Sequence, residues 1–157
     1  PRKEPIVIKV TLAGDPVVEA VLPTQDANGS ITFPAADAVC VGAAHFEDAK
    51  KAIGFWTETT DTVTWNFNVS HPGTFRLTAE VACQDDSAGS LVSAVIDGQE
   101  RQLSIKGTGG WEKFVTVDFG SITLSKAGNT KIVVKARMKP GYAVMNLRSL
   151  HLTPNAR

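Results

Sequence analysis

Alternation of apolar and polar residues is the dominant pattern of this chain. Every second residue is apolar from Val63 to Val69, and the same period runs from Phe75 to Cys83. A period of two is typical of a strand with one face buried and the other in solvent. Because the polar turn Ser70-His71-Pro72-Gly73 separates the two runs, we predict that they form a β-hairpin.

The period recurs at Ile132, Val134, Ala136 and Met138, which we therefore expect to face the core. Shorter strand-like runs cover residues 6–12, 17–22, 37–41, 91–96, 102–105, 113–119 and 144–152. Turn signals such as Asp97-Gly98 and Pro140-Gly141 separate them. The single helix-like stretch is 45–52, about two turns long. Many short strands at regular spacing predict an all-β fold, an antiparallel β-sandwich of the jelly-roll type.

A chain of 157 residues fits one domain. Residues 1–5 have the composition of a linker, so we expect a processed protein or a module excised from a longer one. Residues 6–30 form either outer strands of the sandwich or a small appended hairpin. The polar segment 23–29 is the best internal boundary, and we assign the sandwich to residues 31–153.

Charge excludes several classes of partner. Lys and Arg number 16 and Asp and Glu also number 16, so no overall field attracts nucleic acid or an anionic membrane. No apolar run approaches the ~20 residues of a membrane span. We expect neither nucleic-acid nor membrane binding.

The two cysteines leave two alternatives open. Cys40 and Cys83 both lie among apolar residues, as buried free thiols do. A disulfide between two strands is the other interpretation and would suit a secreted protein. Neither cysteine belongs to a metal-binding spacing.

No catalytic constellation is visible. His45, His71 and His151 lie in unrelated settings, and the chain lacks a nucleophile elbow, a phosphate-binding glycine loop and a metal-binding histidine pair. We therefore expect a protein that is not an enzyme and that requires no cofactor.

The most informative segment is Thr108-Gly109-Gly110-Trp111. Two glycines let the backbone turn sharply and place a large flat ring at the start of a strand. An exposed indole covers the C–H face of a sugar ring, while a nearby amide bonds to its hydroxyls. Trp65, by contrast, belongs to an inward-facing series and is expected in the core.

Several segments together carry a family resemblance. They are Ile53-Gly54-Phe55-Trp56, Asp61-Thr62-Val63-Thr64-Trp65, His71-Pro72-Gly73-Thr74-Phe75, Thr108-Gly109-Gly110-Trp111, Ala127-Gly128 and Met145-Asn146-Leu147. In this order they resemble the carbohydrate-binding modules of family 6 and its relatives, jelly rolls with a galactose-binding-domain-like fold. The chain is also similar to divergent modules appended to bacterial fucosidases, sulfatases and related polysaccharide enzymes. The resemblance covers residues 31–153.

The resemblance implies a set of ligand-binding residues. Trp111 and an aromatic at Phe55 or Trp56 would sandwich one sugar, and Asn146 would hydrogen-bond it. Glu47 would cap the same site. Tyr142 either adds a further aromatic wall or packs over a loop.

The resemblance also implies a structural calcium site, but this sequence departs from it. Arg148 stands where the family usually carries an aspartate, and the early glutamates correspond to Ala35 and Asp37. Only Asp37 keeps a carboxylate, whereas calcium prefers six to eight oxygen ligands. We expect this calcium site to be weakened or absent.

These implications lead to two hypotheses. The first is a monomeric, secreted, periplasmic or cell-surface bacterial module that binds a polysaccharide or oligosaccharide and targets an attached enzyme to it. The second is a structural domain that packs against a catalytic domain and binds no sugar.

Two further features bear on the ligand. A basic stripe would face outward, formed by Lys131, Lys135, Arg137 and Lys139 and joined by Arg148. This stripe would favour an anionic polysaccharide as ligand, or it would be an ordinary solvated face. A second site would lie on a sheet face lined by Thr64, Asn66, Arg76, Thr78 and Glu80.

Overall fold

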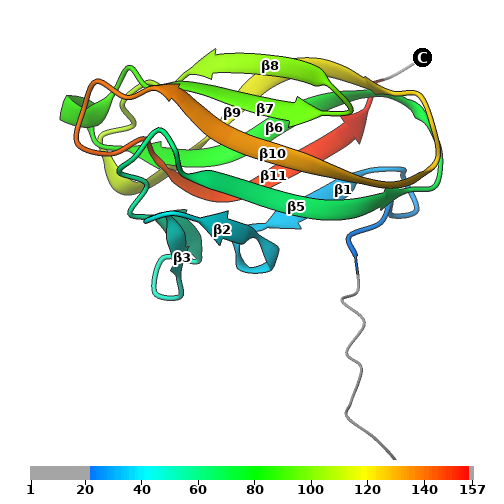
Figure 1. The fold of residues 1–157 in the computed structure, drawn as a ribbon, viewed down its shortest axis with the longest axis horizontal. Helices are drawn as coiled ribbons and strands as arrows, with labels where there is room; N and C mark the ends of the chain where they lie inside the picture. Colours follow the sequence, from blue (N-terminus) through cyan, green and yellow to red (C-terminus); the bar gives the residue numbers. More distant parts are fainter. Residues whose placement is uncertain (1–21, 156–157) are drawn as a thin grey trace, which may run out of the picture.

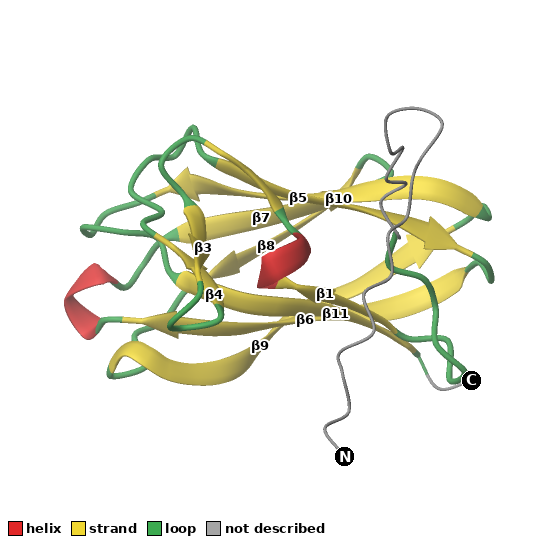
Figure 2. Ribbon diagram, turned by 90° about the horizontal axis from the view of Figure 1, so that it is seen from below, coloured by secondary structure: helices red, strands yellow, loops and turns green. Residues whose placement is uncertain are grey.

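Two antiparallel sheets pack face to face in the computed structural model, which describes residues 22–155 (Figures 1 and 2). The six-stranded sheet contains β1 (Ile31–Pro34), β3 (His45–Glu47), β4 (Ala52–Gly54), β6 (Gly73–Cys83), β9 (Gly110–Leu124) and β11 (Asn146–Pro154). The five-stranded sheet contains β2 (Val39–Val41), β5 (Thr62–Val69), β7 (Leu91–Ile96), β8 (Gln99–Ser104) and β10 (Gly128–Met138). Two short 3-10 helices, η1 (Ala35–Asp37) and η2 (Asp85–Ser87), complete the described elements. The all-β sandwich is confirmed.

Strand order explains how the ends of distant segments meet. The six-stranded sheet has the order β3-β4-β11-β6-β9, with β1 also pairing β11, and the five-stranded sheet has the order β2-β5-β10-β7-β8. Most pairs therefore join strands that are far apart in the sequence. Such long-range pairing is what places loops from four parts of the chain at one end of the sandwich.

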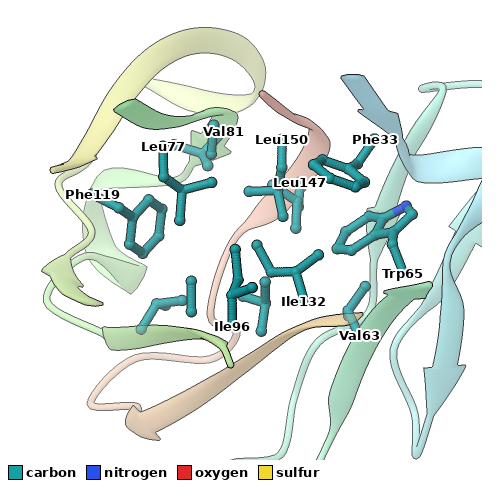
Figure 3. Close-up of a cluster of buried hydrophobic side chains, with 14 of the residues drawn as sticks. Phe33, Val63, Trp65, Leu77, Val81, Ile96, Phe119, Ile132, Leu147 and Leu150 are labelled. Atoms are coloured by element: carbon teal, nitrogen blue, oxygen red, sulfur yellow. The ribbon is translucent and has the colours of Figure 1, made fainter. Parts of the chain in front are cut away.

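The core lies between the sheets and follows the period of two. Leu77, Val81, Leu147 and Leu150 of the six-stranded sheet face Ile96, Ile132 and Trp65 of the five-stranded sheet, and Phe33 closes the side (Figure 3). Trp65 is a core residue, as predicted, and its Nε1 donates a hydrogen bond of 2.8 Å to the Pro34 carbonyl. A buried indole needs such a partner because its N–H has left water.

The predicted hairpin between residues 63–69 and 75–83 is wrong. β5 pairs with β2 and β10, whereas β6 pairs with β11 and β9, so the turn at 70–72 carries the chain from one sheet to the other. Both strands keep an apolar face because each covers the same core from opposite sides. Period alone does not distinguish this crossing from a hairpin.

Two other local predictions are also wrong. Residues 45–52 contain β3, a turn and the start of β4 rather than a helix. Met138 is exposed rather than buried, because the register of β10 with β7 shifts between Ala136 and Met138 and turns its side chain outward.

The predicted linker at 1–5, the predicted strand at 6–12 and all but the last residue of the predicted strand at 17–22 lie outside the described residues. Residues 22–30 form no strand, but they pack against the sandwich. Asn68 N donates to the Pro23 carbonyl at 3.0 Å, and the Gln25 side chain accepts from the backbone N–H groups of Ser70 and His71. No helix among residues 22–155 has the length and apolar character needed to cross a membrane.

Candidate functional site

One end of the six-stranded sheet gathers the residues that the sequence singles out. Leu147 pairs with Ile53, Asn146 with Ala82, and Cys83 with Gly110. The end of β4, the start of β11, the end of β6 and the start of β9 are therefore adjacent. Strand pairing thus explains why residues 47, 55, 111 and 146 meet in space.

Trp111 is held at this end by a tightly bonded loop. Gly109 and Gly110 have φ angles of +85° and +154°, values that favour glycine, and Gly109 N donates to Asp85 Oδ1 at 2.9 Å. Thr108 N donates to the Cys83 carbonyl at 2.9 Å, and Cys83 N donates back to Thr108 Oγ1 at 3.0 Å. The Trp111 ring is partly buried against the core rather than fully exposed.

Phe55 and Trp56 point in opposite directions. Phe55 is 54% exposed, whereas Trp56 is fully buried in the core and cannot face a ligand there. Assigning Trp56 to the site is therefore wrong, and Phe55 takes the aromatic position. Phe55 has φ +52°, a left-handed conformation that costs a non-glycine residue about 1 kcal/mol. Such strain is often found at ligand-binding sites.

His45 supports the Phe55 ring from the neighbouring strand. The two rings are stacked, with centroids 4.6 Å apart and planes 12° from parallel. His45 Nδ1 donates to the Ala43 carbonyl at 2.8 Å, and Ala43 and Ala44 donate their N–H groups to the buried Asp61 carboxylate. His45 was not a predicted site residue, because its contact with Phe55 depends on the pairing of β3 with β4.

Asn146 and Glu47 supply polar atoms beside these rings. Asn146 is only 4% exposed, and its Nδ2 donates to the Trp111 carbonyl at 2.7 Å. This bond leaves Asn146 Oδ1 and a second N–H for a ligand. Glu47 accepts hydrogen bonds from Lys50 Nζ at both carboxylate oxygens, at 3.1 and 2.9 Å.

Tyr142 lies on a loop that several contacts fix. Lys139 Nζ donates to the carbonyls of Gly141 and Tyr142 at 2.8 and 3.1 Å. A Cβ at Gly141 would approach the Ser87 backbone within 2.4 Å, so only glycine fits there. Tyr142 itself is 78% exposed.

These residues line one open pocket of about 140 Å³. Its lining comprises Glu47, Lys50, Phe55, Trp111, Tyr142, Ala143 and Asn146. Five of the six residues proposed from the sequence are therefore brought together, and Trp56 is the exception. Lys50 was missed because two adjacent lysines in a polar turn give no signal of a binding site in the sequence.

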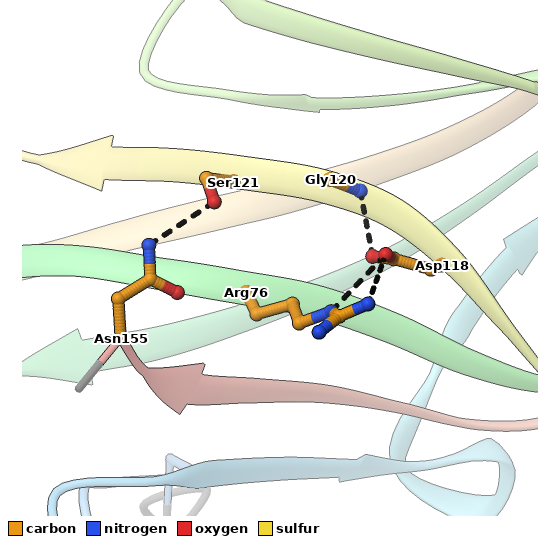
Figure 4. Close-up of polar contacts among 5 residues, drawn as sticks. All are labelled: Arg76, Asp118, Gly120, Ser121 and Asn155. Atoms are coloured by element: carbon orange, nitrogen blue, oxygen red, sulfur yellow. Dashed lines mark hydrogen bonds and ion pairs between the residues drawn. The ribbon is translucent and has the colours of Figure 1, made fainter.

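Larger hollows lie on the sheet faces. One of about 630 Å³ lies on the five-stranded sheet and one of about 530 Å³ on the six-stranded sheet, and neither is lined by an aromatic ring. In the second, Arg76 donates to Asp118, Gly120 N donates to Asp118, and Asn155 donates to Ser121 (Figure 4). The Arg76 guanidinium, which donates hydrogen bonds to the carboxylate of Asp118, lowers the pKa of that carboxyl.

The five residues suggested for a sheet-face site do not form one surface. Thr64 and Asn66 belong to β5, whereas Arg76, Thr78 and Glu80 belong to β6. Because β5 and β6 lie in opposite sheets, these side chains point to opposite sides of the sandwich. A single site that includes all five is therefore excluded.

The basic stripe is also divided between the sheets. Lys131, Lys135 and Arg137 lie on β10, and Arg137 donates to Glu100 at 2.9 Å. Arg148 lies on β11 in the other sheet, where its guanidinium carbon is 3.5 Å from the centroid of the Phe114 ring. The prediction that Arg148 joins the stripe is therefore wrong.

Asp37, the remaining carboxylate of the implied calcium site, is exposed at the end of η1. Among residues 22–155 no three His, Cys, Asp or Glu side chains are placed to hold a metal ion together. Both cysteines are free thiols, Cys40 partly buried and Cys83 buried.

A family model described as "Domain of unknown function (DUF5077)" matches residues 42–157. The chain belongs to the DUF5077 family. The match includes every residue that lines the pocket. A comparison with curated proteins finds no match for this DUF5077 chain.

Solved structures of carbohydrate-binding modules have the same fold as this DUF5077 domain. A family 35 module from Clostridium thermocellum has 18% identity and a TM-score of 0.65, over 81% of this chain and 99% of that one. The family 6 module CBM6cm-2 from Cellvibrio mixtus lichenase 5A, in complex with cellotriose, has 21% identity and a TM-score of 0.62, over 80% and 97%.

A multidomain enzyme is similar as well. The match to the GH26-CBM35 β-(1,4)-mannanase from Podospora anserina has 18% identity and a TM-score of 0.66 and covers 83% of this chain. It spans only 28% of the mannanase chain. At these identities the similarity establishes the fold, and the predicted resemblance to family 6 modules is confirmed at that level. The link to fucosidases and sulfatases stays a prediction.

Proposed function

We propose that this domain is a non-catalytic carbohydrate-binding module whose ligand site is the pocket between Phe55, Trp111 and Tyr142. The observation that carries the proposal is the convergence of three aromatic side chains and the polar groups of Asn146, Glu47 and Lys50 on one small pocket. The solved modules with this fold add support, since one of them was solved in complex with cellotriose.

The chemistry of the pocket suits a sugar ring. An aromatic side chain that covers one face of a sugar ring buries ~50–80 Å² of apolar surface. At about 25 cal/mol per Å², this burial contributes roughly 1–2 kcal/mol to the free energy of binding. Two or three hydrogen bonds add about 1 kcal/mol each. The sum corresponds to an affinity between about millimolar and micromolar. Such weak binding is sufficient for a module that holds an attached enzyme near a multivalent substrate.

The biological setting belongs to the same proposal. We infer a secreted, periplasmic or cell-surface bacterial protein in which this module accompanies a polysaccharide-degrading enzyme, such as a fucosidase or sulfatase. The covalent combination of a catalytic domain with a module of this fold in the Podospora mannanase is consistent with that arrangement.

A glycan array and polysaccharide gel retardation test the proposal across algal, plant and animal glycans. We expect wild type to bind at least one class and Trp111→Ala to lose that binding. Met138→Ala is the matched control, because Met138 is an exposed apolar residue on the opposite sheet. Absence of binding across the panel, or equal binding by wild type and Trp111→Ala, would contradict a sugar site in this pocket.

The competing function is a structural domain that packs against a catalytic domain. The exposed Phe55 and Tyr142 side chains would then lie in a protein interface. Wild type that binds no glycan but co-purifies with a catalytic domain, through a contact that Phe55→Gly weakens, would favour this function.

A further inference from the structure

The charges in the pocket point to the class of sugar. Glu47 and Lys50 form an ion pair in which one ammonium meets both carboxylate oxygens. Their side chains are only 17% and 28% exposed, so the pair is partly shielded from solvent. The two charges cancel within the pocket lining, and Lys50 keeps one of its three N–H donors for a ligand.

Two acceptor oxygens of the pocket lining lie close together beside Gly54. A Cβ at position 54 would lie 1.9 Å from Glu47 Oε1 and 3.0 Å from Asn146 Oδ1. The Glu47 carboxylate thus occupies the space that a side chain at position 54 would take, so glycine lets Glu47 lie beside Asn146 in the pocket lining. Carboxylate and amide oxygens accept hydrogen bonds and do not donate them, so this side of the pocket favours a ligand that supplies O–H donors.

Other cations near the pocket are engaged elsewhere or lie outside its lining. Lys139 donates to two carbonyls of the Tyr142 loop, and Arg148 covers the Phe114 ring. Lys113 lies beside Gly109 and does not line the pocket. An anionic group placed against Glu47 and Asn146 would meet two acceptor oxygens, and among residues 22–155 no unpaired cation lines the pocket to compensate its desolvation.

The volume limits how much of a glycan can enter. About 140 Å³ is well below the roughly 300–1,000 Å³ of sites that enclose drug-sized ligands. One ring with its hydroxyls is the unit that such a hollow accepts.

From these observations we propose that the pocket selects one neutral sugar ring, whose hydroxyls donate to Glu47 and Asn146, and rejects a uronic acid or sulfated ring at the same position. This inference rests on the proposed function and adds the ligand class to it. It also separates the pocket from the basic stripe on β10, which lies on the other sheet.

The test compares matched glycans that differ only in an acidic group: a neutral sugar, its uronic acid and its sulfated form, with dissociation constants measured by calorimetry. We expect wild type to bind the neutral form at least about tenfold more tightly. Glu47→Gln leaves Lys50 without its anion, so we expect the preference to shift toward the acidic forms by about tenfold. Lys50→Gln leaves Glu47 unpaired and is expected to widen the preference for the neutral form.

The chain offers a close control. Asp48 and Lys51 form an ion pair with the same spacing, one residue further along, and neither lines the pocket. Asp48→Asn and Lys51→Gln change the net charge equally and are expected to shift the preference by less than about twofold. Tighter binding of acidic glycans by wild type, or equal shifts in Glu47→Gln and Asp48→Asn, would overturn the inference while leaving the sugar site in place. Wild type that binds no glycan would overturn the proposed function itself.

Discussion

Phe55 combines two properties that rarely occur together at one residue. Its ring is exposed and stacked on His45, and its backbone has a positive φ that glycine adopts without strain. An aromatic residue thus occupies a position at which the backbone conformation favours glycine. This combination lets the contribution of the ring to binding be measured apart from its contribution to folding.

Phe55→Gly should therefore weaken sugar binding without unfolding the domain. Loss of one aromatic wall, roughly 1–2 kcal/mol, lowers affinity by about five- to thirtyfold. The relief of strain offsets the greater freedom of glycine in the unfolded chain, so the free energy of unfolding should change by less than about 1 kcal/mol. Calorimetry and urea denaturation measure the two effects. A large loss of stability with unchanged affinity would mean that Phe55 has a structural role only.

The reactivity of the two cysteine thiols can be predicted from their surroundings. Burial, and then the nearby Asp61 charge, raises the pKa of the Cys40 thiol, and burial with Asp85 and Asp86 raises that of Cys83. A raised pKa leaves less thiolate at neutral pH, and thiolate is the reactive form. We expect slow labelling by a disulfide reagent in the native protein, faster labelling as pH rises, and rapid labelling of both cysteines in urea. Rapid labelling of Cys83 in the native protein at neutral pH would contradict its buried setting.

At the scale of elements, the loop before β9 positions Trp111. Thr108 and Cys83 exchange two hydrogen bonds, and the Asp85 carboxylate accepts a third from Gly109. These bonds connect the start of β9 to the end of β6 and to η2. The indole is therefore held by a loop that is fixed before any ligand arrives, which reduces the entropy lost on binding.

Thr108→Val tests this arrangement, because valine has a similar shape and lacks the hydroxyl. The Cys83 N–H then loses its acceptor, and we expect the free energy of unfolding to fall by about 1–2 kcal/mol. Affinity should fall by a few-fold as the Trp111 loop loosens. Urea denaturation and calorimetry check the two values. Unchanged affinity in a destabilised Thr108→Val would indicate that loop rigidity does not contribute to binding.

The sequence predicted the elements better than their pairing. The inward series of β5, β6 and most of β10 follow from the period of two, since each strand covers the core on one side. The crossing at 70–72, the replacement of the helix by β3 and β4, and the outward turn of Met138 depend on partners far along the chain. The same holds within the site. Glycines and aromatics marked Trp111 and Phe55, whereas the contacts of His45 and Lys50 arise only when β3 and β4 pair.

At the scale of the whole molecule, the pocket and the sheet faces are separate surfaces. The hollow around Arg76 and Asp118 is larger than the pocket, but it lies on the outer face of the six-stranded sheet and has no aromatic lining. A sugar that binds through its ring faces needs aromatic walls. We therefore expect the sugar to bind at the end of the sandwich rather than on either face.

Arg76→Ala should leave sugar affinity unchanged within about twofold, because this residue is far from the pocket lining. Its partner Asp118 is largely exposed, so the effect on stability should also be small. Affinity measured on the same glycan as for wild type checks this expectation. A loss of tenfold or more would place the ligand on the sheet face.

The accessibility of Trp111 with and without a ligand tests most directly whether the sugar binds in this pocket. Trp56 and Trp65 are buried, so quenching of tryptophan emission by acrylamide reports chiefly on the partly exposed Trp111. We predict that a glycan found on the array protects wild type from quenching and that Trp111→Phe abolishes the quenchable fraction. Glycan binding that leaves the quenching of Trp111 unchanged would show that the sugar binds elsewhere and would contradict a ligand site in this pocket.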